Sequence, residues 1–213
     1  MPAPGRGAGR DLPWIGAAVL CLLLAASAVL TWLGGASSGV SPGPSGSVPP
    51  AARRAAGTPL APVGRAADPV RLRIPAIGVD TVVGPLSLDG DRRLPAPVGY
   101  DGAGWWREGA SPGEAGPAVL AGHLDTPTGP AVFARLVELR PGDRIEITRT
   151  DRSSAVFEVL GTMEFPQDAF PSDVVYGPTR DAQLRLITCA GVYDRTAGRY
   201  LANTVVYASM VAA

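Results

Sequence analysis

The sequence lacks several residue types on which common protein chemistry depends. It contains no lysine, so all 19 basic residues are arginine, and 19 acidic residues balance them. Nucleic-acid-binding proteins carry an excess of positive charge, so a net charge of zero leads us to expect no nucleic-acid partner. There is a single histidine, His123, and there are two cysteines, Cys21 and Cys189. These numbers exclude metal sites built from several histidines, four-cysteine zinc sites and disulfide-rich scaffolds, and we expect no cofactor.

Charged residues are also absent from a long N-terminal stretch, Leu12–Ala52. Its first part, Leu12–Leu33, is almost wholly apolar and is long enough to cross a bilayer as one helix. Trp14 and Trp32 lie near the two ends of this run, and indole rings favour the membrane interface. We therefore predict a transmembrane anchor at residues 12–33.

The basic residues around this segment predict its orientation. Arg6 and Arg10 precede it, and no basic residue follows until Arg53. The positive-inside rule therefore places residues 1–11 in the cytoplasm, which predicts a single-pass membrane protein with its domain outside the cell. A cleaved signal peptide is the alternative, with the small residues Gly34–Ser37 as its cleavage site. Signal peptides usually have an apolar core of only about 7–15 residues, which favours the uncleaved anchor.

Residues 34–68 consist mostly of Gly, Ala, Ser and Pro and have no apolar periodicity. Such a segment cannot bury enough apolar surface to offset the entropy of ordering it. We predict a disordered spacer here. It would connect the anchor to one folded domain at residues 69–213, which is an ordinary length for a single domain.

In residues 69–213, apolar and polar residues alternate in short runs that turn residues separate. Only Ala131–Leu139 has apolar residues at helical spacing. The domain is therefore predicted to be mainly all-β, an antiparallel barrel or sandwich with one brief helix. The expected strands are Val70–Ile74, Ile77–Val83, Ala118–Ala121, Arg144–Thr148, Ala155–Leu160, Gln183–Thr188 and Asn203–Ser209.

Two residues that could perform chemistry follow strand-like runs. Cys189 comes directly after Leu184–Thr188, and His123 follows Ala118–Ala121 after one glycine. A cysteine nucleophile needs a neighbouring base or cation, and imidazole serves as one at neutral pH. One end of a barrel could bring the two together, which favours a catalytic pair. Taken singly, Cys189 also fits a small buried residue, and His123 fits a structural or solvated histidine.

Arginine could supply positive charge at such a site. Arg195 and Arg199 both lie in a predicted loop, Gly191–Tyr200, between the cysteine-bearing strand and the last strand. A guanidinium group stays charged and can hold a substrate carbonyl or stabilise a tetrahedral oxyanion. Because Arg199 is nearer the final strand, which would restrain it, we predict Arg199 to be the catalytic arginine, with Arg195 as the alternative.

Together these motifs resemble the sortases, specifically the actinobacterial group usually called class F. The likeness runs through about Val70–Ala208, and a histidine, a Thr-Cys pair and an arginine-bearing loop follow one another in the family's order. The N-terminal anchor and spacer also fit that family. The matching segments are Ser111–Glu114 (SPGE), Ala121–Thr126 (AGHLDT), Leu186–Gly191 (LITCAG) and Tyr200–Ala208 (YLANTVVYA).

The resemblance implies a sortase-like eight-stranded β-barrel with one or two short helices. It also implies a membrane-anchored cysteine transpeptidase. Cys189 would attack the Thr–Gly bond of an LPXTG-like sorting signal and form a thioacyl intermediate. His123 would protonate the leaving amine and then deprotonate the incoming amine. The implied partners are surface proteins that carry the sorting signal and an amine acceptor in the cell wall or on another protein.

Two positions depart from the family pattern. Arg185 occupies the first position of the nucleophile motif Thr-Leu-x-Thr-Cys, and Asn203 stands where better-known classes have arginine. The resemblance therefore assigns His123 and Cys189 and leaves the arginine open. Other functions to consider are an extracytoplasmic cysteine peptidase or hydrolase, a sortase-like domain that only binds peptides, and a structural cell-envelope protein. Papain-like hydrolases have cysteine before histidine in the chain, which is the reverse of the order here.

Overall fold

The computed structural model describes residues 65–90 and 93–212. The predicted cytoplasmic segment 1–11, the predicted anchor 12–33 and most of the predicted spacer 34–68 lie outside the described residues. In the part of the chain that is described, no helix has both the length and the apolar character needed to span a membrane.

The last residues before the first strand contact the folded domain. Arg65 Nη2 donates a hydrogen bond to the carbonyl oxygen of Arg107 (2.7 Å), and the guanidinium lies 5.6 Å from the ring centroid of Trp105. The Ala66 N–H donates to Oε1 of Glu114 (2.6 Å). These contacts connect the end of the predicted spacer to the domain.

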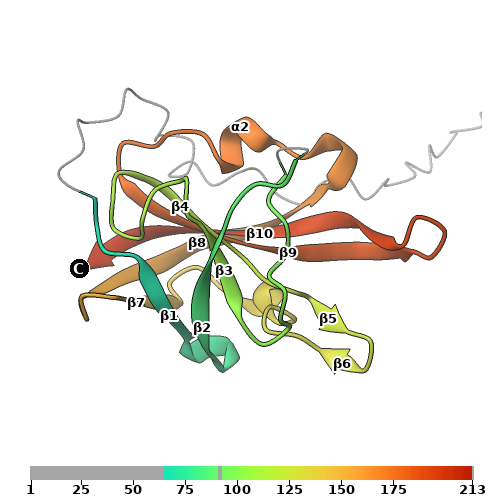
Figure 1. Cartoon of the computed structure of the whole chain (residues 1–213), viewed down its shortest axis with the longest axis horizontal. Coiled ribbons are helices and arrows are strands. Elements are labelled where there is room, and N and C mark those ends of the chain that lie inside the picture. The colour runs from blue at the N-terminus through green and yellow to red at the C-terminus, as the bar shows by residue number, and fades with distance from the viewer. Residues whose placement is uncertain (1–64, 91–92, 213) are drawn as a thin grey trace, which may run out of the picture. The chain divides into compact units, whose positions relative to one another are not determined.

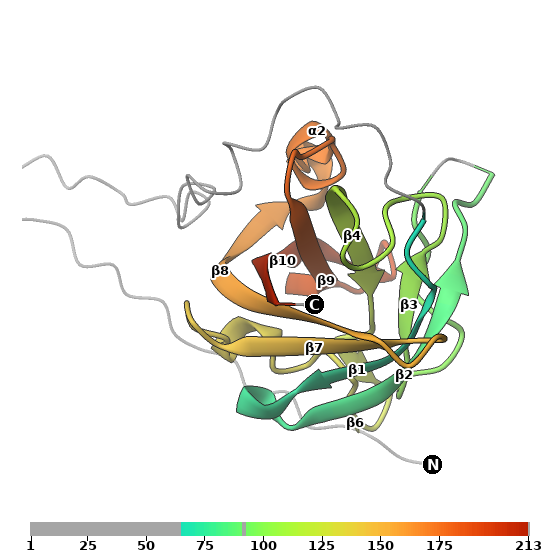
Figure 2. The same ribbon diagram turned by 90° about the vertical axis from the view of Figure 1, so that its left-hand side faces the viewer.

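The described strands form a closed barrel (Figure 1 and Figure 2). Neighbouring strands in it are antiparallel except for the β2–β3 and β4–β9 pairs, which are parallel. The prediction of an all-β barrel is confirmed. Around the barrel the strands are β1 (Pro69–Ile74), β2 (Val79–Leu86), β3 (Ala103–Trp106), β4 (Gly116–Ala121), β9 (Ala182–Asp194), β10 (Arg199–Ala212), β8 (Ser154–Pro166) and β7 (Arg144–Arg149).

The remaining described elements are short. Between β4 and β7 the chain forms a small hairpin and a 3-10 helix, and between β8 and β9 it forms a 3-10 helix and one turn of α-helix. These elements are η1 (Pro75–Ile77), β5 (Asp125–Thr126), β6 (Gly129–Pro130), η2 (Leu136–Glu138), η3 (Gln167–Ala169) and α2 (Ser172–Val175).

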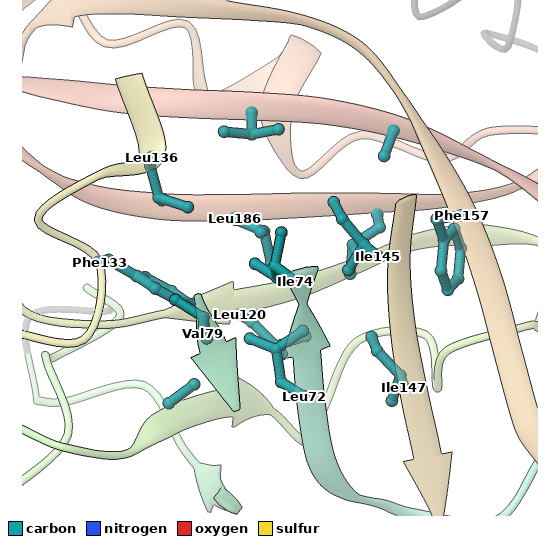
Figure 3. Packing of buried hydrophobic residues seen from close by; sticks show 14 of the residues in the cluster. Leu72, Ile74, Val79, Leu120, Phe133, Leu136, Ile145, Ile147, Phe157 and Leu186 are labelled. Atoms are coloured by element: carbon teal, nitrogen blue, oxygen red, sulfur yellow. The ribbon is translucent and has the colours of Figure 1, made fainter. Parts of the chain in front are cut away.

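Alternating burial along the strands forms the barrel core. In β7, Ile145 and Ile147 are fully buried, whereas Arg144 at the start of the strand and Glu146 between the isoleucines face outward. Successive side chains of a strand point to opposite faces, so one face of each strand lines the interior. Figure 3 shows side chains from several strands meeting there, joined by Phe133 from the segment after β6.

A second apolar layer covers the outer face of β4, β8, β9 and β10. The segment between β8 and β9, which includes α2, lies over this face (Figure 1). Strand β9 is therefore buried on both faces: Leu186 belongs to the barrel core and Ile187 to the outer layer. This double burial explains why its sequence reads as a nearly continuous buried run rather than a clean alternation. The buried members of the outer layer are Val119, Met163, Phe165, Val175, Ile187, Val205 and Tyr207.

Arg185 lies in this outer part of β9, in spite of its charge. Its side chain is fully buried, and its guanidinium carbon lies 4.5 Å from the ring centroid of Tyr207. Nη2 donates to Oε1 of Gln183 (2.7 Å) and Nη1 to the carbonyl oxygen of Leu184 (3.1 Å). Burial lowers the pKa of Arg185 to about 10. The arginine that departs from the family motif thus has a packing role on the sheet.

The predicted helix Ala131–Leu139 is wrong in its extent, because only η2 is regular. Its hydrogen bonds connect residues three apart, from Ala134 N–H to the carbonyl of Ala131 and from Leu139 N–H to that of Leu136. This is the 3-10 pattern, which rarely extends beyond a few residues. In a 3-10 segment, apolar residues three positions apart face the core, as they do in an α-helix. This similarity explains why the periodicity predicted a longer helix.

The predicted loop Gly191–Tyr200 is mostly strand. Strand β9 continues through Cys189 to Asp194, and β10 begins at Arg199, so the two form a long projecting hairpin (Figure 1). The Asp194 carboxylate accepts hydrogen bonds from main-chain N–H groups of the turn (2.8 and 3.1 Å). Gly198 closes the turn with φ of 66°, a left-handed conformation that glycine adopts without strain. Cys189 is therefore in the middle of a strand and not at its end.

We expect Gly122→Ala to destabilise the protein by about 1–3 kcal/mol, the usual cost of overpacking a core. A Cβ atom at Gly122 would lie 2.6 Å from the ring of Phe133, which is fully buried. Chemical denaturation measures the free energy of unfolding. Gly84→Ala is the matched control, since its Cβ would meet nothing within 4 Å. Equal stability of the two variants would contradict the close packing of Gly122 on Phe133.

Candidate functional site

The parallel pairing of β4 with β9 brings the segments that carry the predicted histidine and cysteine next to each other. Just beyond β4, the Gly122 N–H donates to the carbonyl oxygen of Ile187 (3.1 Å). In return, Thr188 Oγ1 donates to the carbonyl oxygen of Gly122 (2.9 Å). His123 and Cys189 each come two residues after Ala121 and Ile187, the last paired positions of β4 and β9, so continuation of this register puts their segments next to each other.

His123 is positioned by the loop before β3. Its Nε2 lies 2.7 Å from the carbonyl oxygen of Pro97, and its ring centroid lies 4.7 Å from that of Tyr100. A carbonyl oxygen only accepts hydrogen bonds, so Nε2 carries the proton, and Nδ1 is the acceptor of the neutral ring. The Phe133 N–H also donates to the carbonyl oxygen of His123 (2.9 Å). Nδ1 is therefore the nitrogen that can take a proton from a neighbouring nucleophile.

Cys189 is half-buried and forms no disulfide in the described part of the chain. Burial raises the pKa of its thiol, and the negative charge of Asp125 raises it further. The thiol therefore rests in its protonated form at neutral pH. A nucleophilic attack by this sulfur requires a base that removes the proton.

Asp125 connects the histidine segment to the last strand. Its Oδ2 accepts a hydrogen bond from the hydroxyl of Tyr200 on β10, and this bond is the main reason that the pKa of Tyr200 rises to about 12. Tyr200 also packs edge-on against Tyr193 across the hairpin, with ring centroids 5.1 Å apart. The hydrogen bond thus joins β5 to the β9–β10 hairpin on the side of the cysteine.

Two adjoining hollows lie in this region, and Cys189 lines the first of them. The first is a cavity of about 180 Å³, with polar walls from β8, β9 and β10 and an apolar wall from the segment around Phe133. The second is a groove of about 940 Å³ beside the β8–β10 pair. The two share the lining residues Val137, Glu164, Gly191 and Thr204. The thiol therefore opens onto a small cavity that adjoins a groove of the size of a ligand site.

The two candidate arginines lie farther along the hairpin than Cys189. Asn203 is the cross-strand partner of Cys189, whereas Arg199 pairs with Asp194 near the turn. Arg199 Nη1 donates to Oε1 of Gln167 (2.9 Å), and Nε2 of Gln167 donates to Oδ1 of Asn203 (3.2 Å). Gln167 therefore connects Arg199 to the partner of the cysteine. Arg195 lies in the exposed turn itself.

Several residues of the site were not identified from the sequence. The Pro97 carbonyl holds His123, but a main-chain acceptor leaves no signal in residue types. Tyr200 was noted only as part of a matching segment, and its bond to Asp125 joins positions that lie far apart in the chain. Glu164 lies near the end of β8 and Gln167 begins η3, and no motif marks either of them. The proximity of Asp125 to His123 in the sequence was the one usable signal.

Among the residues that the structure describes, no cluster of three or more His, Cys, Asp or Glu side chains could hold a metal ion. The chemistry available at this site is that of a thiol, an imidazole, a carboxylate and a phenol. Such a set can perform nucleophilic acyl transfer with proton exchange between the sulfur and the imidazole.

Solved structures of sortases share this fold at low sequence identity. Sortase A from Listeria monocytogenes is 20% identical, with a TM-score of 0.52 over 69% of this chain and 89% of that one. A lid mutant of sortase A from Corynebacterium diphtheriae is 20% identical, with a TM-score of 0.54 over 71% and 73%. Sortase C-1 from Actinomyces oris is 22% identical, with a TM-score of 0.52 over 68% and 76%. At these identities the likeness concerns the fold alone. Among curated protein sequences, none matches the chain.

The family is shown by the sequence of the barrel itself. Residues 72–211 match the model of the sortase domain, which is well over half of the chain. The matched range extends from β1 to β10 and includes His123, Cys189 and Arg199. With the sortase fold described above, this match means that the chain belongs to the sortase family.

Proposed function

We propose that the protein is a cysteine transpeptidase that cleaves an LPXTG-like sorting signal and joins its acyl part to an amine. The observation that carries this proposal is the register of β4 and β9, whose continuation puts the segment of the single histidine next to that of Cys189, which lines a cavity. Membership of the sortase family supports the same type of reaction.

In the first half-reaction, the Cys189 sulfur attacks the carbonyl carbon of the Thr–Gly bond. Because the pKa of the thiol is raised, its proton passes to Nδ1 of His123 as the S–C bond forms. The imidazolium, still held through Nε2 by the Pro97 carbonyl, then protonates the leaving glycine nitrogen. The C–N bond breaks and a thioester remains on Cys189.

In the second half-reaction, an amine acceptor enters from solvent. Its nitrogen attacks the thioester carbonyl, and Nδ1 of His123 takes a proton from that nitrogen. The S–C bond breaks, and the proton returns from the imidazolium to the sulfur of Cys189. The product is a new amide, and the enzyme regains its starting protonation. Water in place of the amine would give hydrolysis by the same steps.

Both half-reactions pass through a tetrahedral intermediate with a negative oxygen, which a positive donor stabilises. Arg199 is the proposed donor. In the resting state its guanidinium is held by Gln167, which also contacts the partner of Cys189. If the guanidinium of Arg199 donated its hydrogen bond to the substrate carbonyl in place of Gln167, it would stabilise the oxyanion, and the backbone of β10 would not need to move.

The groove beside the β8–β10 pair is the proposed binding site for the sorting signal. It holds about 940 Å³, and its walls include the apolar side chains of Leu139, Met163 and Leu201. A Leu-Pro pair has the same apolar character. The groove shares Gly191 and Glu164 with the cavity of Cys189, so a peptide that lies in it can reach the thiol.

The location and subtype are further parts of the proposal. The apolar run at residues 12–33 and the arginines before it favour a membrane-anchored enzyme with its domain outside the cell. A substrate whose sorting signal is held at the same membrane face would meet such an enzyme in two dimensions. Class F is the proposed subtype, and it rests on the motif segments around His123 and Cys189.

We expect Cys189→Ala to abolish turnover, because no other described residue offers a thiol. Cys21→Ala, which removes the other cysteine of the chain, should leave turnover intact. Mass spectrometry of products from a pool of LPXTG-like peptides and an amine measures both. Product formation by Cys189→Ala, or a trapped acyl adduct on another residue, would refute the assignment.

His123→Ala should lower kcat by ~10²–10⁴, the usual contribution of a general acid and base. Steady-state kinetics across neutral pH test this expectation. Tyr100→Phe is the control, because it keeps the ring that packs on His123 and should retain activity. Wild-type rates for His123→Ala at every pH would show that the imidazole is only structural.

Arg199→Ala should lower kcat by ~10²–10³, which is the usual effect of losing an oxyanion donor. Arg195→Ala, in the exposed turn of the same hairpin, is the matched control and should leave kcat unchanged. Both variants are compared with one peptide and one amine. An inactive Arg195→Ala beside a fully active Arg199→Ala would reverse the assignment.

A further inference from the structure

Glu164 is an unpaired carboxylate at the meeting point of the two hollows. It lies on β8 opposite Thr204, which pairs on its other side with Thr188, the neighbour of Cys189. It lines both the cavity of the thiol and the adjoining groove. Among the described residues, no hydrogen-bond or ion-pair partner contacts its carboxylate.

The carboxylate of Glu164 lies close to Gly191 of β9, the strand that carries Cys189. A Cβ atom at Gly191 would lie 3.4 Å from Oε1 of Glu164 and 3.1 Å from Cβ of Ala202. Gly191 also has φ of 75°, so both its conformation and its surroundings favour the absence of a side chain. The carboxylate thus faces the stretch of β9 that follows Cys189.

The surroundings of Glu164 combine one negative charge with an apolar wall. Phe133, Ala134 and Val137 line the side of the cavity that η2 and the segment before it provide. Among the described residues that line the two hollows, Glu164 is the one acid, and Arg140 of the larger groove is the one base. The cavity of the thiol itself therefore offers a carboxylate with no cation beside it.

We propose that Glu164 is the specificity residue that binds an alkylammonium group, with the aliphatic stem of the ligand against Ala134 and Val137. This inference rests on the proposed transpeptidase function and names the charge that its site selects. An ammonium group with a carbon stem matches an apolar wall that ends in a carboxylate, because each part of the ligand meets its complement. An acidic group in the same place would meet only repulsion.

Two sources can supply this group: a basic side chain in the sorting signal, or a second amine on the acceptor. Binding of peptide or acceptor displaces water from the cavity, which strengthens an ion pair that would be weak on an open surface. We expect a preference of about three- to tenfold in kcat/KM for the ligand that carries the ammonium group.

The test uses the full chain in detergent and two sets of probes. The first set is LPXTG-type peptides in which X is Lys, norleucine or Glu, with one common amine. The second set is 1,5-diaminopentane against n-pentylamine, with one neutral peptide. Preference for the lysine peptide identifies the sorting signal as the source, and preference for the diamine identifies the acceptor.

The decisive variant is Glu164→Gln, which keeps the shape and removes the charge. It should abolish the preference and, relative to the neutral peptide with n-pentylamine, improve turnover of the peptide with X as Glu. Glu164→Asp should keep part of the preference. Glu158→Gln is the matched control and should keep all of it, because Glu158 is an exposed glutamate of β8, as Glu164 is, but lines neither hollow. Unchanged preference in Glu164→Gln, or no preference in the wild type, would overturn the inference.

Failure of the proposed function gives a different result. If the wild type turns over none of the peptides, the transpeptidase proposal falls. Equilibrium titration of the Cys189→Ala protein with the same peptides and amines still decides the role of Glu164. A three- to tenfold tighter Kd for an ammonium-bearing ligand, lost on adding Glu164→Gln, supports the cation site, and equal Kd values exclude it.

Discussion

The site depends on one constraint, which is that β9 is buried on both faces while it pairs with β4 and β10. A one-residue slip of such a strand would exchange the barrel core for the outer layer at every position, with Leu186 and Ile187 changing sides. The pairing of Asn203 with Cys189 and the hydrogen bond from Gly122 to Ile187 therefore have a single register. Proton transfer needs groups within hydrogen-bond reach, and in the proposed mechanism packing at some distance from the thiol would fix that geometry.

The electrostatics of the site favour a neutral thiol at rest. Burial and the charge of Asp125 both raise the pKa of Cys189, so little thiolate is present at neutral pH. The thiolate is the form that oxidants attack, and a protonated, half-buried sulfur is therefore protected in an oxidising environment. The hydrogen bond from Tyr200 holds the Asp125 carboxylate in place. In the proposed mechanism, activation then depends on His123, whose orientation by Pro97 leaves Nδ1 as the acceptor.

Sequence patterns predicted the parts of this molecule that follow from local alternation and from residue chemistry. Most strands were predicted because one of their faces lies in the core. His123 and Cys189 were predicted to be a catalytic pair because each follows a strand-like run and a thiol nucleophile needs a base, and this pair stays a prediction. Strand β3 was missed, since Ala103 and Trp105 are buried with a glycine between them and show no alternation. The predicted helix at Ala131–Leu139 failed for a related reason: 3-10 turns bury residues at nearly the same spacing. Contacts such as that of the Pro97 carbonyl depend on tertiary packing and leave no trace in the pattern.

The same negative charge that disfavours the thiolate bears on how an amine reaches the site. An amine is mostly protonated at neutral pH, and as an ammonium ion it is attracted by carboxylates but cannot attack a thioester. In the proposed mechanism the negative charge of Asp125, near Cys189, attracts the ammonium ion, and His123 acts as the base that frees the lone pair. Recruitment and activation of the acceptor are thus assigned to different residues. A cation placed directly opposite Cys189 would repel the incoming ammonium ion. The chain has Asn203 at that position, and Arg199 lies farther along the hairpin.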